Sequence, residues 1–233
     1  EKTVEKFFSD GGRGLNVTAP HKKKAFLIAD RVRTRARNAG AINILTAQDD
    51  GTLVGDNTDG SGLVRDLTEN LRIKLKGSRI LLLGAGGSAR GAIMPLAREK
   101  PAMLTVANRT HANALSLVES FTGMTKIEAC PLDKLTADFD VVIHATAAGL
   151  KNRIPLLDGG VIRKADCYDL MYGRDETPFM KWAQRQGAKS IHDGWGMLVE
   201  QAAESFKIWT GVLPETKALL AARPSRRRRD SGP

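Results

Sequence analysis

Lys22 and Asp59 are the side chains in this sequence best suited to moving a proton. Lys22 ends the segment NVTAPHK at positions 16–22, and Asp59 lies in the segment GDNTDG at positions 55–60. Oxidation of a secondary alcohol by hydride transfer needs a group that takes the hydroxyl proton, and a lysine beside a carboxylate can relay one. The residues alone leave a plainer interpretation open, because three consecutive lysines are typical of a solvated face and Asn-Thr-Asp-Gly is typical of a turn.

Polar side chains near these glycine turns could hold a polyhydroxylated molecule. The residues in question are Asn16, Thr18, Asn43 and Asp59. Their amide, hydroxyl and carboxylate groups can together donate to, and accept from, several hydroxyl groups.

A glycine-rich turn lies between a short apolar segment at 79–83 and a helix-like segment at 89–98. Its residues are Gly84, Ala85, Gly86, Gly87, Ser88 and Ala89. In a dinucleotide-binding turn the first glycine allows the tight bend, the second lets backbone approach a pyrophosphate, and the last small residue lets helix and strand pack closely. The helix N-terminus then binds the phosphates. The flanking strand and helix favour this interpretation over a turn that binds no ligand.

The end of the next predicted strand indicates which dinucleotide is bound. NAD sites usually place an Asp or Glu about 20 residues after the glycine turn, where it bonds the ribose 2′-hydroxyl. Here the chain has Asn108, Arg109 and Thr110, none of which is acidic. Arg109 can pair with a 2′-phosphate and stack on adenine, and Thr110 can donate a hydroxyl. The segment therefore favours NADP, unless Arg109 is simply a solvated turn residue.

The elements that must position these residues alternate between strand-like and helix-like segments. Short apolar runs predict strands at 79–83, 103–106, 140–143 and 165–170, and helical spacing predicts helices at 89–98, 112–121 and 177–186. Such alternation implies a parallel sheet covered by helices on both faces. We therefore predict an α/β fold with a Rossmann-like, NADP-binding domain at 59–193.

The two ends of the chain depart from this alternation. Residues 1–58 hold Gly and Asn turn signals around short runs, and residues 214–222 could form a helix. Residues 195–209 predict a helix with an apolar stripe at Leu198, Ala202, Ser205 and Trp209. We predict that 1–58 and 194–222 form an incomplete α/β substrate domain, with the chemistry in a cleft between the two domains.

Composition limits the classes of protein that fit. The net charge of +10 suggests nucleic acid, but it falls to +6 without Arg226–Arg229, which belong to a tail at 223–233 whose composition predicts disorder. No apolar stretch reaches the length of about 18 residues that a membrane span needs, and no signal peptide is visible. Cys130 and Cys167 have no CxxC partner, which fits a reduced, cytoplasmic setting. We therefore expect no nucleic-acid or membrane partner.

Taken together, the motifs resemble those of the shikimate dehydrogenase family. The matching segments occur in family order between about residues 11 and 214, and they lie at 16–22, 55–60, 84–90, 108–110, 177–179, 196–198 and 201–202. The resemblance implies a reversible, NADPH-linked reduction of 3-dehydroshikimate to shikimate, which serves chorismate and aromatic amino-acid biosynthesis.

The resemblance also implies roles for individual residues. Lys22 would handle the proton at the reacting oxygen, and Asp59 would orient it. The residues expected to contact the substrate are Asn16, Thr18, Asn43, Tyr172 and Gln201. Leu170 and Gly194 would join the glycine turn and Asn108–Thr110 at the cofactor. NADP is the one cofactor expected, with no metal ion, in a monomer or homodimer.

Some positions depart from the family pattern. The family opens with a strand and a Ser-Lys-Ser-Pro-like segment whose serines hold the substrate carboxylate; no such segment occurs here, so we expect the N-terminal part to be missing. His144 replaces a family Asn at the end of a predicted strand, and a packed histidine without chemistry is its simplest interpretation. Asn113 stands where many members carry a second arginine.

Two alternatives stay open at this point. One is a relative that acts on quinate, or on both acids, with NAD. The other is a truncated, catalytically silent nucleotide-binding protein, which the missing serines favour.

Overall fold

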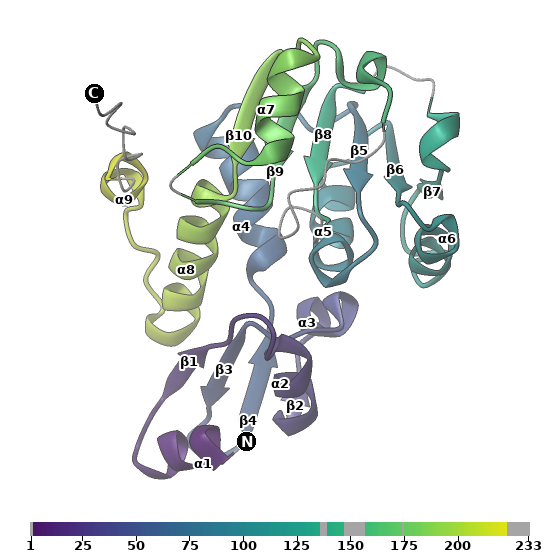
Figure 1. The fold of residues 1–233 in the computed structure, drawn as a ribbon. Coiled ribbons are helices and arrows are strands. Elements are labelled where there is room, and N and C mark those ends of the chain that lie inside the picture. Colours follow the sequence, from purple (N-terminus) through teal and green to yellow (C-terminus); the bar gives the residue numbers. More distant parts are fainter. Residues whose placement is uncertain (1, 136–138, 147–156, 174, 223–233) are drawn as a thin grey trace, which may run out of the picture.

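The computed structural model describes residues 2–135, 139–146, 157–173 and 175–222, which fold around two separate β-sheets (Figure 1). One sheet has six strands and the other has four. The basic tail predicted to be disordered, at 223–233, lies outside the described residues. Within the described ranges, no helix is long and apolar enough to cross a membrane.

The larger sheet is entirely parallel, which confirms the predicted Rossmann-like architecture. Its strands are β5 (Arg79–Leu83), β6 (Met103–Ala107), β7 (Ile127–Ala129), β8 (Val141–His144), β9 (Asp166–Asp169) and β10 (Ser190–Asp193). The spatial order is β10-β9-β8-β5-β6-β7, so the strand order reverses between β5 and β8. Ligands of such sheets bind beyond the carboxyl ends of the strands at this reversal point. Those ends point toward the smaller sheet (Figure 1).

Helices cover both faces of the larger sheet. They are α4 (Asp59–Arg65), α5 (Gly87–Arg98), α6 (His111–Glu119) and α7 (Pro178–Arg185), with short helical turns at η1 (Asp66–Asn70), η2 (Leu132–Lys134) and η4 (Gly159–Ile162). Successive residues of a strand point to opposite faces, so Ile80 and Leu82 pack with α4, α5 and α6, whereas Leu81 and Leu83 pack with α7. A strand buried on both faces needs apolar side chains throughout, which explains the unbroken apolar run of β5.

The smaller sheet mixes strand directions in the order β1-β3-β4-β2. Its strands are β1 (Gly14–Asn16), β2 (Arg31–Val32), β3 (Ile44–Ala47) and β4 (Leu53–Asp56). Strand β3 is antiparallel to both β1 and β4, and β2 runs parallel to β4. Helices α1 (Lys2–Ser9), α2 (Lys22–Ile28) and α3 (Thr34–Ala39) surround a small core that includes Ile42 and Leu45.

Helix α8 (Trp195–Thr210) runs antiparallel along α4, and α9 (Lys217–Ala221) follows it. A Cβ added at Gly62 would meet the backbone of Gln201 and Met197, whereas one at Gly196 would meet Asp66. The predicted apolar stripe of α8 was wrong at Ala202, which is exposed. The residues on the buried side are Gly196, Val199, Glu200, Ala203 and Ser205. Small residues occur on this side because the two helix backbones approach closely.

The domain boundaries stay a prediction. Residues 1–58 contain the whole smaller sheet, and the larger sheet lies within 59–193. Helix α8, which the prediction gives to the substrate domain, packs against α4, which the prediction gives to the NADP-binding domain.

Candidate active site

The structure brings Lys22 and Asp59 into contact, although 37 positions separate them. Lys22 is the first residue of α2 and Asp59 the first of α4. The Lys22 Nζ atom lies 2.6 Å from Asp59 Oδ2, and 29% and 21% of the two side chains are exposed. A carboxylate in the first turn also suits the positive end of the helix dipole. The pair is therefore held in place but still open to a ligand.

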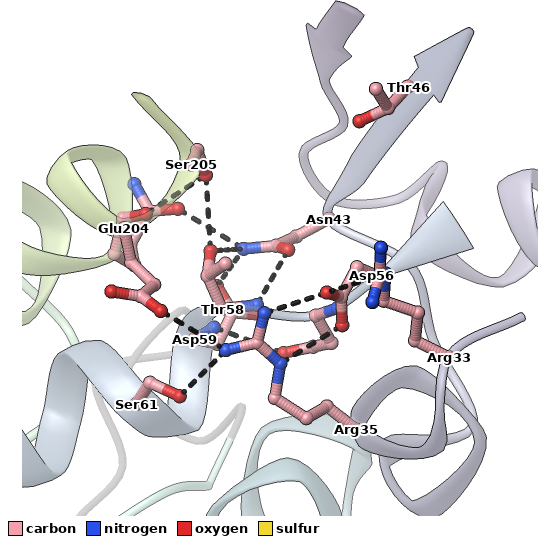
Figure 2. Close-up of polar contacts among 12 residues, drawn as sticks. Arg33, Arg35, Asn43, Thr46, Asp56, Thr58, Asp59, Ser61, Glu204 and Ser205 are labelled. Carbon is pink, nitrogen blue, oxygen red and sulfur yellow. Dashed lines mark hydrogen bonds and ion pairs between the residues drawn. The ribbon is translucent and has the colours of Figure 1, made fainter. Parts of the chain in front are cut away.

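Asn43 connects Asp59 to α8 (Figure 2). Its amide nitrogen lies 2.9 Å from Thr58 Oγ1, 3.0 Å from Asp59 Oδ1 and 3.1 Å from Gln201 Oε1, and its oxygen accepts from the Thr58 N–H at 2.9 Å. An amide has two hydrogens for these three acceptors. One acceptor can therefore bond a ligand hydroxyl without breaking the cluster.

Arg35 fixes the turn that presents Asp59 (Figure 2). Its guanidinium holds the buried Asp56 carboxylate with two bonds, of 3.1 and 2.7 Å. Asp56 Oδ1 accepts from the Asn57 N–H, and Asn57 Oδ1 accepts from the Asp59 N–H. Burial alone would lower the pKa of Arg35, but Asp56 and Glu204 outweigh burial and the pKa is raised. The sequence prediction missed Arg35 and Asp56.

Three other residues predicted to contact the substrate lie apart from this cluster. Asn16 and Thr18 have exposed positions, and the Val17 N–H between them donates to the Asn43 carbonyl at 2.7 Å. Within the described part of the chain, their side chains hydrogen-bond to no other predicted site residue. Tyr172 follows β9 and is 49% exposed. The structure thus brings together Lys22, Asp59, Asn43 and Gln201, and leaves these three beside open space.

The glycine turn has the geometry that its sequence predicts. Gly84 has a φ of +119°, which favours glycine, and a Cβ there would lie 2.8 Å from the Ala145 carbonyl oxygen. Gly86, Gly87 and Ser88 are exposed at the start of α5, whereas Ala89 is buried. A Cβ at Gly86 or Gly87 would meet nothing within 4 Å. The open N-terminus of α5 therefore has room for a pyrophosphate, so the residues fit a dinucleotide.

The remaining predicted cofactor residues lie along the same edge of the larger sheet. Arg109 and Thr110 are exposed between β6 and α6, and the Asn108 side chain donates to the Thr110 carbonyl at 2.9 Å. Leu170 and Gly194 follow the neighbouring strands β9 and β10, where a Cβ on Gly194 would overlap the Leu170 carbonyl. This edge places Arg109 on one side of the glycine turn and Leu170 with Gly194 on the other, which suits an extended dinucleotide.

An open glycine turn at the reversal point of a parallel sheet, together with a lysine from α2 beside the smaller sheet and a carboxylate from α4 beside the larger one, defines a dinucleotide-dependent oxidoreductase. Comparison with protein families narrows this class. The Shikimate dehydrogenase substrate binding domain matches residues 1–45, Shikimate / quinate 5-dehydrogenase matches 66–154, and the Shikimate 5'-dehydrogenase C-terminal domain matches 194–222. The chain belongs to the shikimate dehydrogenase family.

Individual relatives agree with this assignment. Shikimate dehydrogenase (NADP(+)) of Aeromonas hydrophila is 50% identical over 220 residues, which cover 94% of this chain and 80% of the relative. The crystal structure of an Ael1 enzyme from Pseudomonas putida has a TM-score of 0.90 at 43% identity, covering 95% of this chain and 82% of that one. Shikimate 5-dehydrogenase from Thermus thermophilus, in complex with NADP(H) and shikimate, has a TM-score of 0.82 at 32% identity, covering 95% and 81%.

Proposed function

We propose that this chain is an NADP-dependent shikimate dehydrogenase, which reversibly reduces 3-dehydroshikimate to shikimate. The observation that carries the proposal is the 2.6 Å contact of Lys22 with Asp59, on the side of the molecule where the glycine turn opens. Over 220 aligned residues the chain is 50% identical to a relative named shikimate dehydrogenase (NADP(+)), which supports the same activity here.

Lys22 is the acid–base residue in this proposal. When bound, the reduced nicotinamide cofactor supplies a hydride to the carbonyl carbon of the substrate. Lys22 Nζ gives a proton to the carbonyl oxygen, so the ketone becomes a secondary alcohol, and the same amine takes the proton back in the reverse direction. Asp59 holds the Nζ atom in place at 2.6 Å. Asn43 and Gln201 bind ring hydroxyls, because the amide of Asn43 has only two hydrogens for its three acceptors and one acceptor can bond the substrate. Asn16, Thr18 and Tyr172 complete the substrate site.

The cofactor is NADP, held by two parts of the same sheet edge. Backbone N–H groups at Gly86–Ala89 bind the pyrophosphate, since α5 presents them without a side-chain cap. Arg109 pairs with the 2′-phosphate, next to Asn108 and Thr110. Leu170 and Gly194 lie at the nicotinamide end.

The cytoplasm is the proposed location, and aromatic amino-acid biosynthesis is the proposed role. Cys130 and Cys167 are free, and burial raises the pKa of the Cys167 thiol to about 12, so this thiol stays protonated and unreactive. Two unpaired cysteines fit a reducing compartment. The active unit is proposed to be a monomer or a homodimer.

Kinetic assays with each combination of two substrates and two cofactors test the proposal. The purified chain would be assayed with shikimate and with quinate, each with NADP and with NAD, by following absorbance of the reduced nicotinamide. The expected result is the highest kcat/KM with shikimate and NADP. A preference for quinate and NAD would replace this proposal with the quinate alternative. Clear NADPH binding without turnover of either acid would replace it with a silent nucleotide-binding protein.

A further inference from the structure

A buried histidine and a buried aspartate form a pair at the edge of the larger sheet that faces the cofactor site. His144 ends β8 and Asp169 ends β9, and the two are direct partners in the register of these strands. His144 Nδ1 lies 3.0 Å from Asp169 Oδ1, and the side chains are 1% and 0% exposed. The Phe179 ring stacks on the imidazole, with centroids 4.5 Å apart and planes 10° apart. The pair therefore has one fixed orientation.

Hydrogen bonds fix the direction of each donor in this pair. An ionised carboxylate only accepts, so His144 carries a hydrogen on Nδ1. In the neutral ring Nε2 is then an acceptor, and it lies 2.6 Å from Thr146 Oγ1, which donates to it. Asp169 also accepts from the Met171 N–H at 3.1 Å and from Thr177 Oγ1 at 2.5 Å.

Two of the three segments bound by the pair border the proposed cofactor site, and the third begins α7. Thr146 follows β8 and lies close to the glycine turn. A Cβ added at Gly84 would lie 3.1 Å from Thr146 Cγ2. Met171 lies between the predicted site residues Leu170 and Tyr172. Thr177 caps α7 by accepting from the Met180 N–H at 3.2 Å. Through Asp169, His144 thus connects the segments that follow two neighbouring strands.

We propose that His144 is a positioning residue for the cofactor, acting through Thr146 and Asp169. The pair sets the distance between the glycine turn and the segment that carries Leu170, and so fixes the width of the site where the dinucleotide lies. The inference rests on the proposed use of NADP. It contradicts the simplest interpretation of His144 as a packed residue without a role.

Cofactor binding by single and double variants tests this proposal without relying on turnover. The variants are His144→Phe, which keeps a stacked ring, Thr146→Val, which keeps the shape, Thr146→Ser, which keeps the hydroxyl, and the His144→Phe/Thr146→Val double variant. The readouts are the Kd for NADPH by fluorescence and the KM for shikimate. Thr68→Val is the matched control, since its hydroxyl bonds the Val64 carbonyl within the α4–η1 segment.

The expected result is a Kd for NADPH raised about tenfold in His144→Phe and in Thr146→Val, the size of one lost hydrogen bond. The double variant should bind NADPH no more weakly than whichever single variant binds it less tightly. Thr146→Ser and Thr68→Val should have the Kd of the parent. Unchanged binding in Thr146→Val overturns the proposal even if His144→Phe fails to fold. The proposal is also overturned if the fold-increases in Kd of the two single variants multiply in the double variant. If the parent binds NADPH but turns over no shikimate, the proposed function fails while these binding data still decide the role of His144.

Discussion

At the residue scale, the contact between Lys22 and Asp59 allows a direct test of the proposed acid–base role of Lys22. Lys22→Ala removes the proposed proton donor, so kcat should fall by roughly 10²–10⁴-fold. The Kd for NADPH should stay unchanged, because Lys22 comes from the smaller sheet's helix α2. Steady-state kinetics and cofactor fluorescence measure the two effects. Lys23→Ala is the matched control, because Lys23 is the exposed neighbour. Near-normal turnover in Lys22→Ala would remove Lys22 from the proposed role.

Arg109 allows a second test at this scale. Arg109 is exposed after β6, the strand that neighbours β5 and its glycine turn, and a guanidinium there can pair with a 2′-phosphate. Arg109→Ala should weaken NADPH binding by about 10- to 100-fold, the usual value of a charge-assisted hydrogen bond. Binding of NADH should barely change, since NADH has no 2′-phosphate. Titration of both cofactors measures the difference, and an equal loss for both would refute the assignment.

How far the sequence predicts the site depends on where each partner lies. Lys22 and Asp59 belong to recognisable segments, and the structure places them in contact. Arg35 carries no such signal, because its partners become neighbours only in the folded chain: Glu204 is 169 positions away. Asp56 belongs to a recognised segment, but nothing in the sequence indicates that it is buried under a guanidinium. The sequence therefore predicts the reactive side chains, whereas the residues that hold them in place are identified only from the folded structure.

At the element scale, the close packing of α4 on α8 predicts a strong effect of a single methyl group. In Gly62→Ala the new Cβ would lie 2.6 Å from the Gln201 nitrogen and 2.8 Å from the Met197 carbonyl oxygen. Neither backbone atom can move without shifting α8, so the free energy of unfolding should fall by about 1–3 kcal/mol in urea denaturation. Gly91→Ala in α5 is the control, because its Cβ would meet only Ala39, at 3.6 Å. A stability loss as large in Gly91→Ala would contradict this explanation.

Asp66, the first residue of η1 directly after α4, predicts a pH dependence of stability. Burial raises the pKa of Asp66, which accepts from Tyr168 Oη at 2.7 Å and from Asn70. A carboxyl group with a raised folded-state pKa stabilises the fold at low pH and loses this contribution as the pH rises from about 3.9 through its folded value. Asp66→Asn has no such titration. Its stability relative to the parent should therefore increase with pH, as measured by denaturation between acid and neutral pH. A difference that is independent of pH would exclude Asp66 as the source.

Elements differ in how well the sequence defines them. Strand β5 was predicted at its true bounds because burial on both faces leaves an unbroken apolar run. The strands of the smaller sheet have only two to four residues, too few for a periodic pattern. The error at Ala202 has another cause. The predicted stripe at Leu198, Ala202, Ser205 and Trp209 contains Ser205 from the buried face of α8, but Val199 and Ala203 are buried in place of their neighbours Leu198 and Ala202.

At the scale of the whole molecule, the sequence predicts the parallel sheet but not the position of the second one. Alternating strands and helices restrict the larger sheet to few arrangements, since parallel connections are right-handed and short. Within the described residues, the unit of the smaller sheet meets the unit of the larger one through the turn at Asp56–Asp59, through α8, and through α3 packed on α5. No local sequence pattern describes these contacts. Arg35, Asp56 and Glu204 hold the first two together, and these are the residues that the sequence did not reveal.

The division of the proposed acid–base pair, Lys22 and Asp59, between two units has a consequence for selectivity. Asp59 and Gln201 belong to helices that pack on the six-stranded sheet or on each other, whereas Lys22 and Asn43 come with the four-stranded sheet. A rotation of one unit against the other would separate the amine from the carboxylate. Under the proposed function, hydride transfer would therefore require the arrangement in which Lys22 and Asp59 are in contact, and a compound that pushed the two units apart would be a poor substrate.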